Sequence, residues 1–476
     1  MNWNTAHRRK ENIMIVGGVG FGGREHVTTD AFLRSDTVAN VYVVPGNDAI
    51  FHAYQVDSRV KRILGTDGKP FKLDKDLNMQ KMLDLAVCAK ELDALVFVGP
   101  ENPLSHGIID VFTQQGIPIV GPTKQAAMLE VSKSWAKDIM ASLDIPIPRY
   151  VYVNDPDQAK EYIENCGYQV VVKADGLAEG KGSIVTGTVE EGCKAVYALM
   201  EDPKRPYPEA GKRVVIEERL YGEEFSFFVL TDGVTLLPLG WGRDYKRARD
   251  GNKGLNTGGM GAHSPYGEHE EELTELVMRR IAEPLIRGCR ERYGITYKGI
   301  LYIGGTFVHR EGVRLPYVFE INVRMGDPEA QVIYPRLKTD LAQLCRAVVE
   351  GKLDEIGPLE WDPRHYLCVC LTSGQLRIKV AGKGWRNYPG YPDSYCPGRV
   401  IHGLETLSPD TLVFHNGTVW DEERGCYITS GGRVLSIVGV GETLEEAYEK
   451  TYQEAQKVTF DGCYYRHDIA RTPIAF

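Results

Sequence analysis

Four short apolar runs in the first 120 residues constrain the fold of this chain most strongly. They lie at 13–16, 41–44, 94–98 and 117–120, and the segments between them are long enough to hold helices. Alternation of buried strands with helices predicts a parallel, doubly wound α/β sheet. Because ligands bind at the carboxyl ends of the strands in such a sheet, the Gly/Pro-rich corners that follow these runs are candidate binding loops.

The loop after the first run, residues 18–23, has the spacing G-x-G-x-x-G ahead of an expected helix. Backbone N–H groups at the N-terminus of a helix can bind a phosphate in this setting. A dinucleotide site would also need an acidic residue at the end of the next strand, which instead ends at Val44-Pro45-Gly46. The missing acidic residue therefore argues against a dehydrogenase. It leaves open a tight turn without a ligand, or a site for another phosphate.

A second glycine-rich loop, residues 174–183, follows a strand that ends at Lys173. Its glycines allow the loop to fold over a polyphosphate with its amides pointing inward. One lysine at the end of the strand and one on the preceding helix can neutralise phosphate charge. The nucleotide contacts predicted here are Lys137, Lys173, Gly176, Gly180, Lys181 and Gly182.

About 35 residues beyond this loop, the carboxylates of Glu217, Glu218 and Glu224 lie at and beyond the end of another strand. Such a segment can bind the adenine amine through its backbone and the ribose hydroxyls through a carboxylate. Taken singly, these charges would be read as surface residues. Their order after the lysine and the glycine loop favours an ATP site instead.

Glu320 and Asn322 lie two residues apart on an expected strand, so their side chains share one face. Two oxygen ligands on one face suit Mg²⁺, which completes its coordination with phosphate and water, and Mn²⁺ stays open as an alternative. Arg324 continues the same face and can bind a carboxylate or phosphate with two hydrogen bonds. A solvent-facing polar strand is the alternative, but it leaves the apolar flanks and the following Gly-Asp-Pro turn unexplained.

Composition excludes several functional classes. The net charge of −9 argues against a nucleic-acid-binding surface.

The N-terminus is polar, without a signal core, and no apolar stretch approaches the roughly 20 residues that span a bilayer. The ten cysteines form no C-x-x-C pair, which predicts a reduced, cytoplasmic protein without a zinc site. We expect small-molecule partners, no nucleic acid, no membrane, and a monomer or homodimer.

Seven motifs in this order resemble the glycinamide ribonucleotide synthetase family of the ATP-grasp superfamily, along nearly the whole chain. They are 23–26 (GREH), 45–47 (PGN), 99–104 (GPENPL), 173–177 (KADGL), 256–261 (NTGGMG), 324–331 (RMGDPEAQ) and 429–433 (TSGGR). No single motif is decisive, but together they are highly specific.

The resemblance implies an α/β ATP-grasp fold in three parts. These are an N-terminal doubly wound domain at 1–125, an ATP-grasp domain at 126–346 with a lid at about 144–218, and a C-terminal mixed α/β domain at 347–476. It implies that Asp244, Lys246 and Arg324 act in catalysis. It implies substrate contacts at Gly22, Gly23, Arg24, Glu25, Pro45, Gly46, Asn47, Gly99, Pro100, Glu101, Asn256 and Asp327.

The reaction implied by the resemblance joins glycine to 5-phosphoribosylamine in de novo purine biosynthesis. The carboxylate attacks the γ-phosphate of ATP, and the amine then attacks the resulting acyl phosphate to give an amide, ADP and phosphate. No covalent enzyme nucleophile is required, which agrees with the absence of a convincing Cys–His or Ser–His pairing in the sequence.

The chain departs from the family pattern at several positions near the expected substrates. Residues 19–21 look inserted, 243–246 read Arg-Asp-Tyr-Lys after Trp241, and 59–76 and 375–391 differ in length. A specialised paralogue that joins another small carboxylate or amine is therefore an alternative, as is a nucleotide-binding protein without turnover. One further hypothesis is that Trp241 narrows the acyl pocket.

Overall fold

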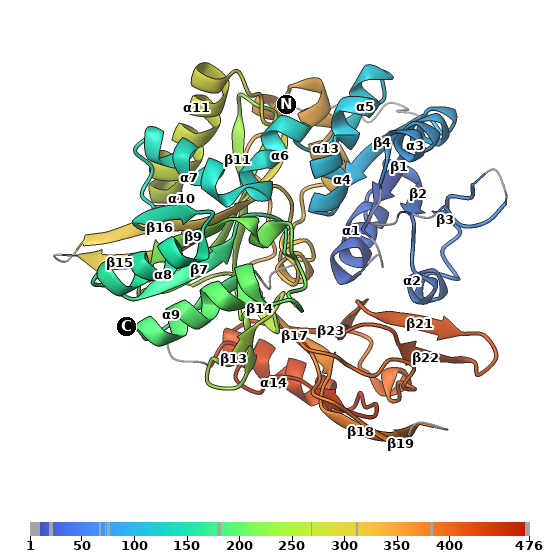
Figure 1. The fold of residues 1–476 in the computed structure, drawn as a ribbon. Helices are drawn as coiled ribbons and strands as arrows, with labels where there is room; N and C mark the ends of the chain where they lie inside the picture. Colours follow the sequence, from blue (N-terminus) through green and yellow to red (C-terminus); the bar gives the residue numbers. More distant parts are fainter. Residues whose placement is uncertain are drawn as a thin grey trace.

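The first part of the chain forms the expected parallel sheet, seen at the upper right of Figure 1. Strand β1 (Glu11–Val16) is central in the order β3-β2-β1-β4-β5, and every pairing is parallel. The other strands are β2 (Val38–Val44), β3 (Val60–Arg62), β4 (Ala94–Val98) and β5 (Ile119–Val120). The helices of this part are α1 (Gly23–Leu33), α2 (Asp48–Ala53), α3 (Met79–Glu91), α4 (Glu101–His106) and α5 (Ile108–Gln114).

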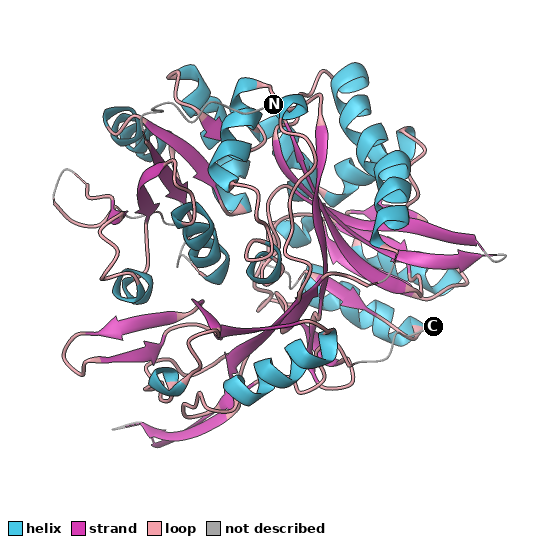
Figure 2. Ribbon diagram, turned by 180° about the vertical axis from the view of Figure 1, so that it is seen from behind, coloured by secondary structure: helices cyan, strands magenta, loops and turns pink. Residues whose placement is uncertain are grey.

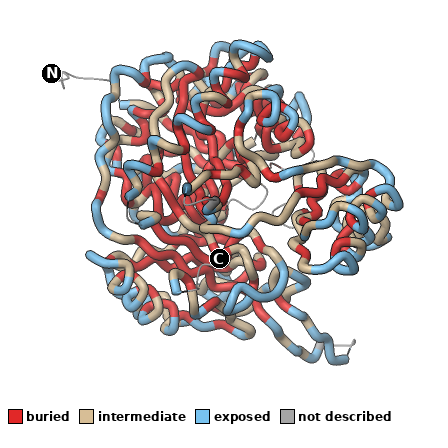
Figure 3. The backbone as a smooth tube through the Cα atoms, turned by 90° about the vertical axis from the view of Figure 1, so that its left-hand side faces the viewer, coloured by how far each residue is buried: buried red, intermediate tan, exposed pale blue. Residues whose placement is uncertain are grey.

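This computed structural model describes residues 10–18, 22–65, 68–71, 73, 77–178, 182–267, 269–310, 313–380 and 384–471. Both faces of the N-terminal sheet are covered, which explains the unbroken apolar runs. Met14 and Val16 pack into one hydrophobic core, while Ile13 and Ile15 pack into another. Adjacent side chains on a strand point to opposite faces, so a strand between two cores is apolar throughout. Figure 3 shows the buried chain in the interior and the exposed chain at the periphery.

A small antiparallel sheet forms in the segment where a lid is expected, and we call this unit the lid. Its order is β6 (Tyr150–Val153), β9 (Val214–Glu218), β7 (Val170–Ala174) and β8 (Ser183–Val185). Helices α8 (Pro156–Asn165) and α9 (Val189–Val196) pack against it around a core of their own. Helices α6 (Lys124–Val131) and α7 (Lys133–Ser142) connect the N-terminal sheet to this unit. The glycine-rich loop joins β7 to β8, and its residues 179–181 lie outside the described part of the chain.

A nine-stranded sheet carries the remainder of the fold. The order is β16-β15-β10-β11-β14-β17-β23-β20, with β24 paired to β17. Because β14 pairs with β17, strands from before and after residue 346 form one continuous sheet, which Figure 2 shows from behind. The strands are β10 (Glu223–Thr231), β11 (Leu236–Asp244), β14 (Gly261–Ser264), β15 (Gly299–Arg310), β16 (Val313–Asn322), β17 (His365–Ser373), β20 (Leu412–His415), β23 (Arg433–Gly441) and β24 (Cys463–Tyr464).

Three hairpins and five further α-helices make up most of the remaining described structure. The hairpins pair β12 (Arg247–Arg249) with β13 (Lys253–Asn256), β18 (Leu376–Val380) with β19 (Gly384–Tyr388), and β21 (Thr418–Asp421) with β22 (Cys426–Thr429). The helices are α10 (Glu270–Val277), α11 (Glu283–Tyr293), α12 (Ala330–Ile333), α13 (Leu341–Glu350) and α14 (Leu444–Ala455).

Helices α10 and α11 are joined by a π-helical turn at Met278–Ala282. Pro284 follows that turn and has no N–H to donate to the carbonyl four residues earlier, which favours an irregular turn there. No helix in the described ranges has both the length and the apolar character needed to cross a membrane. All ten cysteines are free.

The C-terminal part contacts the N-terminal sheet through buried histidines. The backbone N–H of His415 donates to Nδ1 of His26 at 2.9 Å, and the two rings stack. Nearby, the ring of His52 on α2 stacks on Trp420 of β21 at 3.4 Å. Burial, together with the neighbouring histidines, lowers the pKa of His26 well below its usual value and that of His415 to about 3. The contact is therefore made by neutral rings.

We predict that acidification weakens this contact. Both histidines take up a proton near pH 6.5 in the unfolded chain but stay neutral at that pH in the folded chain. The free energy of unfolding is therefore highest above pH 6.5 and falls as the pH drops below it. Two such groups together cost up to about 4 kcal/mol of unfolding free energy between pH 7 and pH 5. Urea titrations at both pH values measure this loss. A His26→Gln/His415→Gln double variant should lose less on acidification, whereas the exposed-residue control His106→Gln should behave as wild type. Equal losses in all three proteins would contradict the assignment.

Candidate active site

A cleft of about 540 Å³ lies between the lid, the nine-stranded sheet, and helices α6 and α7. Helices α1 and α4 of the N-terminal part, strands of the lid and of the nine-stranded sheet, and loops far apart in sequence all contribute residues to it. Of the residues singled out in the sequence, it is lined by Arg24, Glu101, Lys137, Lys173, Gly176, Gly182, Glu217, Glu218, Glu224, Asp244, Lys246, Asn256, Glu320, Asn322, Arg324 and Asp327.

Lys137 on α7 and Lys173 on β7 meet at one carboxylate. The Glu217 side chain lies 3.2 Å from Nζ of Lys137 and 3.0 Å from Nζ of Lys173. All three side chains are almost fully buried. Burial, together with the charge of Lys173, lowers the pKa of Lys137 to about 8, although Glu217 opposes this shift. Two ammonium groups around one carboxylate leave an excess positive charge, which a phosphate would balance.

The glycine-rich loop is anchored at both ends. Nζ of Lys133 donates to the carbonyl of Gly176 at 2.9 Å, and the Asp175 carboxylate accepts from the backbone N–H of Ser134 at 3.1 Å. At the far end, the amide of Asn256 donates to the carbonyl of Ser183 at 3.1 Å. The loop is thus held between the start of α7 and the β12–β13 hairpin.

Glu320 and Asn322, at the end of β16, present two oxygens to the cleft. Nζ of Lys246 lies 3.0 Å from Oε1 of Glu320, and Arg324 donates to Oδ1 of Asn322 at 3.3 Å. The charge of Lys246 lowers the pKa of Glu320 well below its usual value, and burial opposes this only in part. A carboxylate that stays ionised beside an amide oxygen fits a hard divalent cation, with the remaining ligands from phosphate and water.

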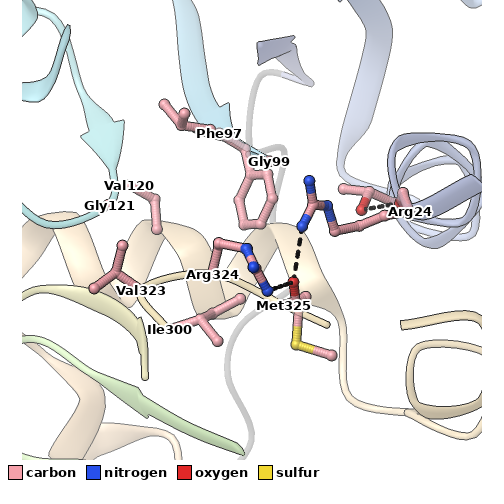
Figure 4. Close-up of a pocket in the computed structure, with 11 residues that line it drawn as sticks. Arg24, Phe97, Gly99, Val120, Gly121, Ile300, Val323, Arg324 and Met325 are labelled. Carbon is pink, nitrogen blue, oxygen red and sulfur yellow. Dashed lines mark hydrogen bonds between the residues drawn. The ribbon is translucent and has the colours of Figure 1, made fainter. Parts of the chain in front are cut away.

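Arg324 links Asn322 to the N-terminal part of the chain. Its Nε donates to Glu101 at 3.1 Å, and its terminal nitrogen donates to Glu130 at 2.7 Å. Burial raises the pKa of Glu130 to about 7, Arg324 opposes the shift and Glu101 adds to it. Figure 4 shows Arg24 and Arg324 donating to the same carbonyl, that of Met325, at 3.0 and 3.1 Å. Two guanidinium groups are therefore fixed where the N-terminal sheet meets the cleft.

Comparisons with known proteins cover the whole length of this architecture. Residues 11–130, 131–330 and 388–472 match the family models for the phosphoribosylglycinamide synthetase N domain, ATP-grasp (A) domain and C domain. The phosphoribosylamine–glycine ligase of Archaeoglobus fulgidus is 38% identical over 484 residues, which covers 95% of this chain and 98% of the relative. That of Halalkalibacterium halodurans is 40% identical over 465 residues, covering 98% and 97%.

This chain belongs to the phosphoribosylglycinamide synthetase family. Among solved structures, that of phosphoribosylamine–glycine ligase from Thermotoga maritima aligns with a TM-score of 0.74 and 29% identity. The alignment covers 96% of this chain and 100% of that one. The α/β ATP-grasp fold expected from the sequence is confirmed.

Eight of the expected substrate contacts in the N-terminal part do not line the cleft. They are Gly22, Gly23, Glu25, Pro45, Gly46, Asn47, Gly99 and Pro100. Some have structural partners: the N–H of Gly22 donates to Glu25 at 2.8 Å, and the Asn47 side chain caps α2 by accepting from Ala49. Gly180 and Lys181 of the glycine-rich loop, and the family departure at 19–21, lie outside the described residues.

Gly23 is a point of close approach between the N-terminal and C-terminal parts. A Cβ atom at this position would lie 1.7 Å from Oδ1 of Asn416 and 2.7 Å from Nε2 of Gln331. No side chain fits there unless both neighbours move. The family motif at 23–26 therefore has a packing role at its first position, while its Arg24 reaches the cleft.

The structure contradicts the hypothesis that Trp241 narrows the acyl pocket. Its ring is 2% exposed and packs against Phe225, Phe227 and Tyr266, away from the cleft. Trp241 and Asp244 lie an odd number of residues apart on β11, so their side chains occupy opposite faces of the sheet. The closeness of Trp241 in sequence to residues 243–246 therefore wrongly suggested that its side chain reaches the cleft.

Trp241→Leu should accordingly change stability and leave substrate choice unchanged. The substitution removes most of a buried ring and leaves Oγ1 of Thr274 without its indole donor, 2.8 Å away in the wild type. A loss of about 3 kcal/mol in unfolding free energy is expected. Urea titration measures it, and a panel of amino-acid substrates checks that the order of preference is retained. Improved use of larger amino acids would restore the pocket hypothesis.

The charged cleft residues that were not singled out as site residues in the sequence include Glu130, Lys133, Glu329 and Arg433. Arg433 ion-pairs with Asp327 at 2.7 Å and also donates to the backbone carbonyl of Asp327 at 2.6 Å. The family motifs at 324–331 and 429–433, which contain Glu329 and Arg433, were signals for two of them. The family departure at 375–391 forms the β18–β19 hairpin, which projects from the C-terminal part at the bottom of Figure 1.

Proposed function

We propose that this chain is an ATP-dependent ligase that joins glycine to 5-phosphoribosylamine. One observation carries the proposal: two buried lysines and the Glu320–Asn322 pair line the same cleft in a chain that matches the family along its length. The products would be glycinamide ribonucleotide, ADP and phosphate, a step of de novo purine biosynthesis.

The chemistry follows from the weakness of a carboxylate as an electrophile. An oxygen of the glycine carboxylate attacks the γ-phosphate and ADP leaves; the sugar amine then attacks the acyl carbon, loses a proton and displaces phosphate. Lys137 and Lys173 hold phosphate charge, and Arg324 stabilises charge where the acyl group is formed. The lid and its glycine-rich loop exclude water, which would otherwise hydrolyse the activated acid.

We further propose that Glu320 and Asn322 hold Mg²⁺, or Mn²⁺ in its place. A divalent ion bound there supplies positive charge to the phosphates. Glu217, Glu218 and Glu224 are assigned to the nucleotide, and Arg24, Glu101, Asn256 and Asp327 to the substrates. We retain the division at 1–125, 126–346 and 347–476 as a proposal, and we infer a cytoplasmic location from the free cysteines.

ADP release in the presence of phosphoribosylamine and a panel of small carboxylic acids tests the proposal. Release with glycine and phosphoribosylamine together, and with neither alone, supports it. Release only with another acid or another amine would identify a specialised paralogue, which the Arg243 and Tyr245 side chains in the cleft would help to explain. Nucleotide binding without release for any pair would identify a protein that has lost turnover.

A further inference from the structure

Two further carboxylates line the cleft, from Asp244 on β11 and from Glu329 at the N-terminus of α12. Glu329 is 2% exposed, and the side chain of Asp244 is 9% exposed. They lie close enough that Glu329 contributes, after burial, to raising the pKa of Asp244 to about 7, while Lys246 opposes that shift. Two carboxyl groups therefore lie near each other at a nearly buried position.

Glu329 forms no direct ion pair among the described residues, although the guanidinium groups of Arg324 and Arg433 lie near enough for their charges to act on it. Its Oε1 accepts a hydrogen bond from the hydroxyl of Ser226 at 3.0 Å, and that hydroxyl also lies 3.0 Å from the hydroxyl of Tyr302. No described residue donates a hydrogen bond to Oε2 of Glu329. Glu329 lines the cleft, so this oxygen can accept a hydrogen bond from a ligand there.

The loop before α12 is shaped around this oxygen. A Cβ atom at Gly326 would lie 2.3 Å from Oε2 of Glu329, so only glycine allows the carboxylate to take this position. Within the family motif at 324–331, Gly326 therefore makes room for the side chain three residues later. A hydrogen bond from Ser226 fixes one oxygen of the carboxylate. The missing side chain at Gly326 leaves space for the other oxygen.

Lys246 cannot balance the charge at this end of the cleft. Its Nζ lies 3.0 Å from Glu320 and 3.8 Å from Asp244, so it is shared between two carboxylates. If a divalent ion occupied Glu320, Lys246 would pair with Asp244, and Glu329 would still have no direct ion pair. A small cation that enters the cleft could therefore form an ion pair with Glu329.

Resting on the function proposed above, we propose that Glu329, together with Asp244, binds the α-ammonium group of the amino-acid substrate. The two amines of the reaction differ in charge. The sugar amine must attack with a free electron pair and is neutral when it reacts. The nitrogen of glycine does not react and remains a cation throughout, so it is the group that a fixed buried carboxylate can hold. Loss of this contact should weaken glycine binding and leave nucleotide binding intact.

Glu329→Gln tests this assignment, because it removes the charge and keeps the shape and an oxygen for Ser226. The KM for glycine should rise about 30-fold, as expected for a lost charged hydrogen bond, while the KM values for ATP and phosphoribosylamine change less than about threefold. Inhibition by acetate, which lacks the ammonium group, should not weaken. Glu223→Gln is the matched control, since that carboxylate pairs with Arg314 outside the cleft.

The outcomes separate this inference from the proposed function. Wild-type protein without glycine-dependent ADP release would overturn the function and the inference with it. Wild-type activity with an unchanged glycine KM in Glu329→Gln would overturn the inference alone. So would a rise confined to phosphoribosylamine, because the bound cation would then be the sugar amine. If Glu329→Gln fails to fold, Asp244→Asn with the same three KM values decides: a selective rise for glycine supports the inference, and no such rise overturns it.

Discussion

Glu320→Gln is expected to lower kcat/KM for ligation by about a thousandfold, and to raise the Mg²⁺ concentration needed for half-maximal rate. The substitution keeps one oxygen in place but removes the charge that a divalent cation requires. In the folded protein this carboxylate is ionised, because Lys246 lowers its pKa, so its charge is present across the working pH range. Partial recovery at high Mg²⁺ or with Mn²⁺ is expected, since Asn322 still supplies its oxygen.

Initial rates across a Mg²⁺ titration measure this effect, with ATP binding followed separately in the presence of EDTA. Glu223→Gln again serves as the control, because it neutralises a glutamate of the same sheet that pairs with Arg314 instead of lining the cleft. Wild-type kinetics in Glu320→Gln at low Mg²⁺ would mean that another group holds the metal. The assignment of Asn322 would fail with it.

The parts of this fold that sequence could predict are those encoded by local patterns. The strand at 13–16 is apolar at every position because it lies between two cores, and that pattern needs no knowledge of its neighbours. The pair Glu320 and Asn322 could be placed on one face because a strand has a period of two. Lys173 and the glycine-rich loop were likewise recognisable from one contiguous segment.

The parts that sequence could not predict depend on contacts between distant segments. Glu130 contacts Arg324, which lies 194 residues away, and Arg433 contacts Asp327, 106 residues away. No spacing within either segment reveals its partner. The continuity of the sheet across residue 346 depends in the same way on the pairing of β14 with β17. The prediction that Trp241 lines the acyl pocket was wrong, because the register of β11 decides which face of the sheet each side chain occupies. The nearby motif residues do not reveal that register.

Lys173→Met is expected to raise the KM for ATP about tenfold and to lower kcat about a hundredfold, with the fold retained. Removing one positive group from a dry phosphate site costs transition-state stabilisation of this size. The fold should tolerate the change, because Glu217 keeps its ion pair with Lys137 at 3.2 Å and the unbranched methionine side chain fills the space of the lysine stem. Circular dichroism melting and steady-state kinetics measure the two consequences on the same sample.

The matched control is Lys212→Met, which removes a lysine from the exposed surface of the lid, where its side chain is 68% exposed. Both variants lower the net charge of the lid by one, so a long-range electrostatic effect would appear in both. A kinetic defect confined to Lys173→Met locates the effect at the cleft. Wild-type kinetics in Lys173→Met would remove the phosphate role from this lysine, and would leave its burial beside Glu217 as a structural ion pair only.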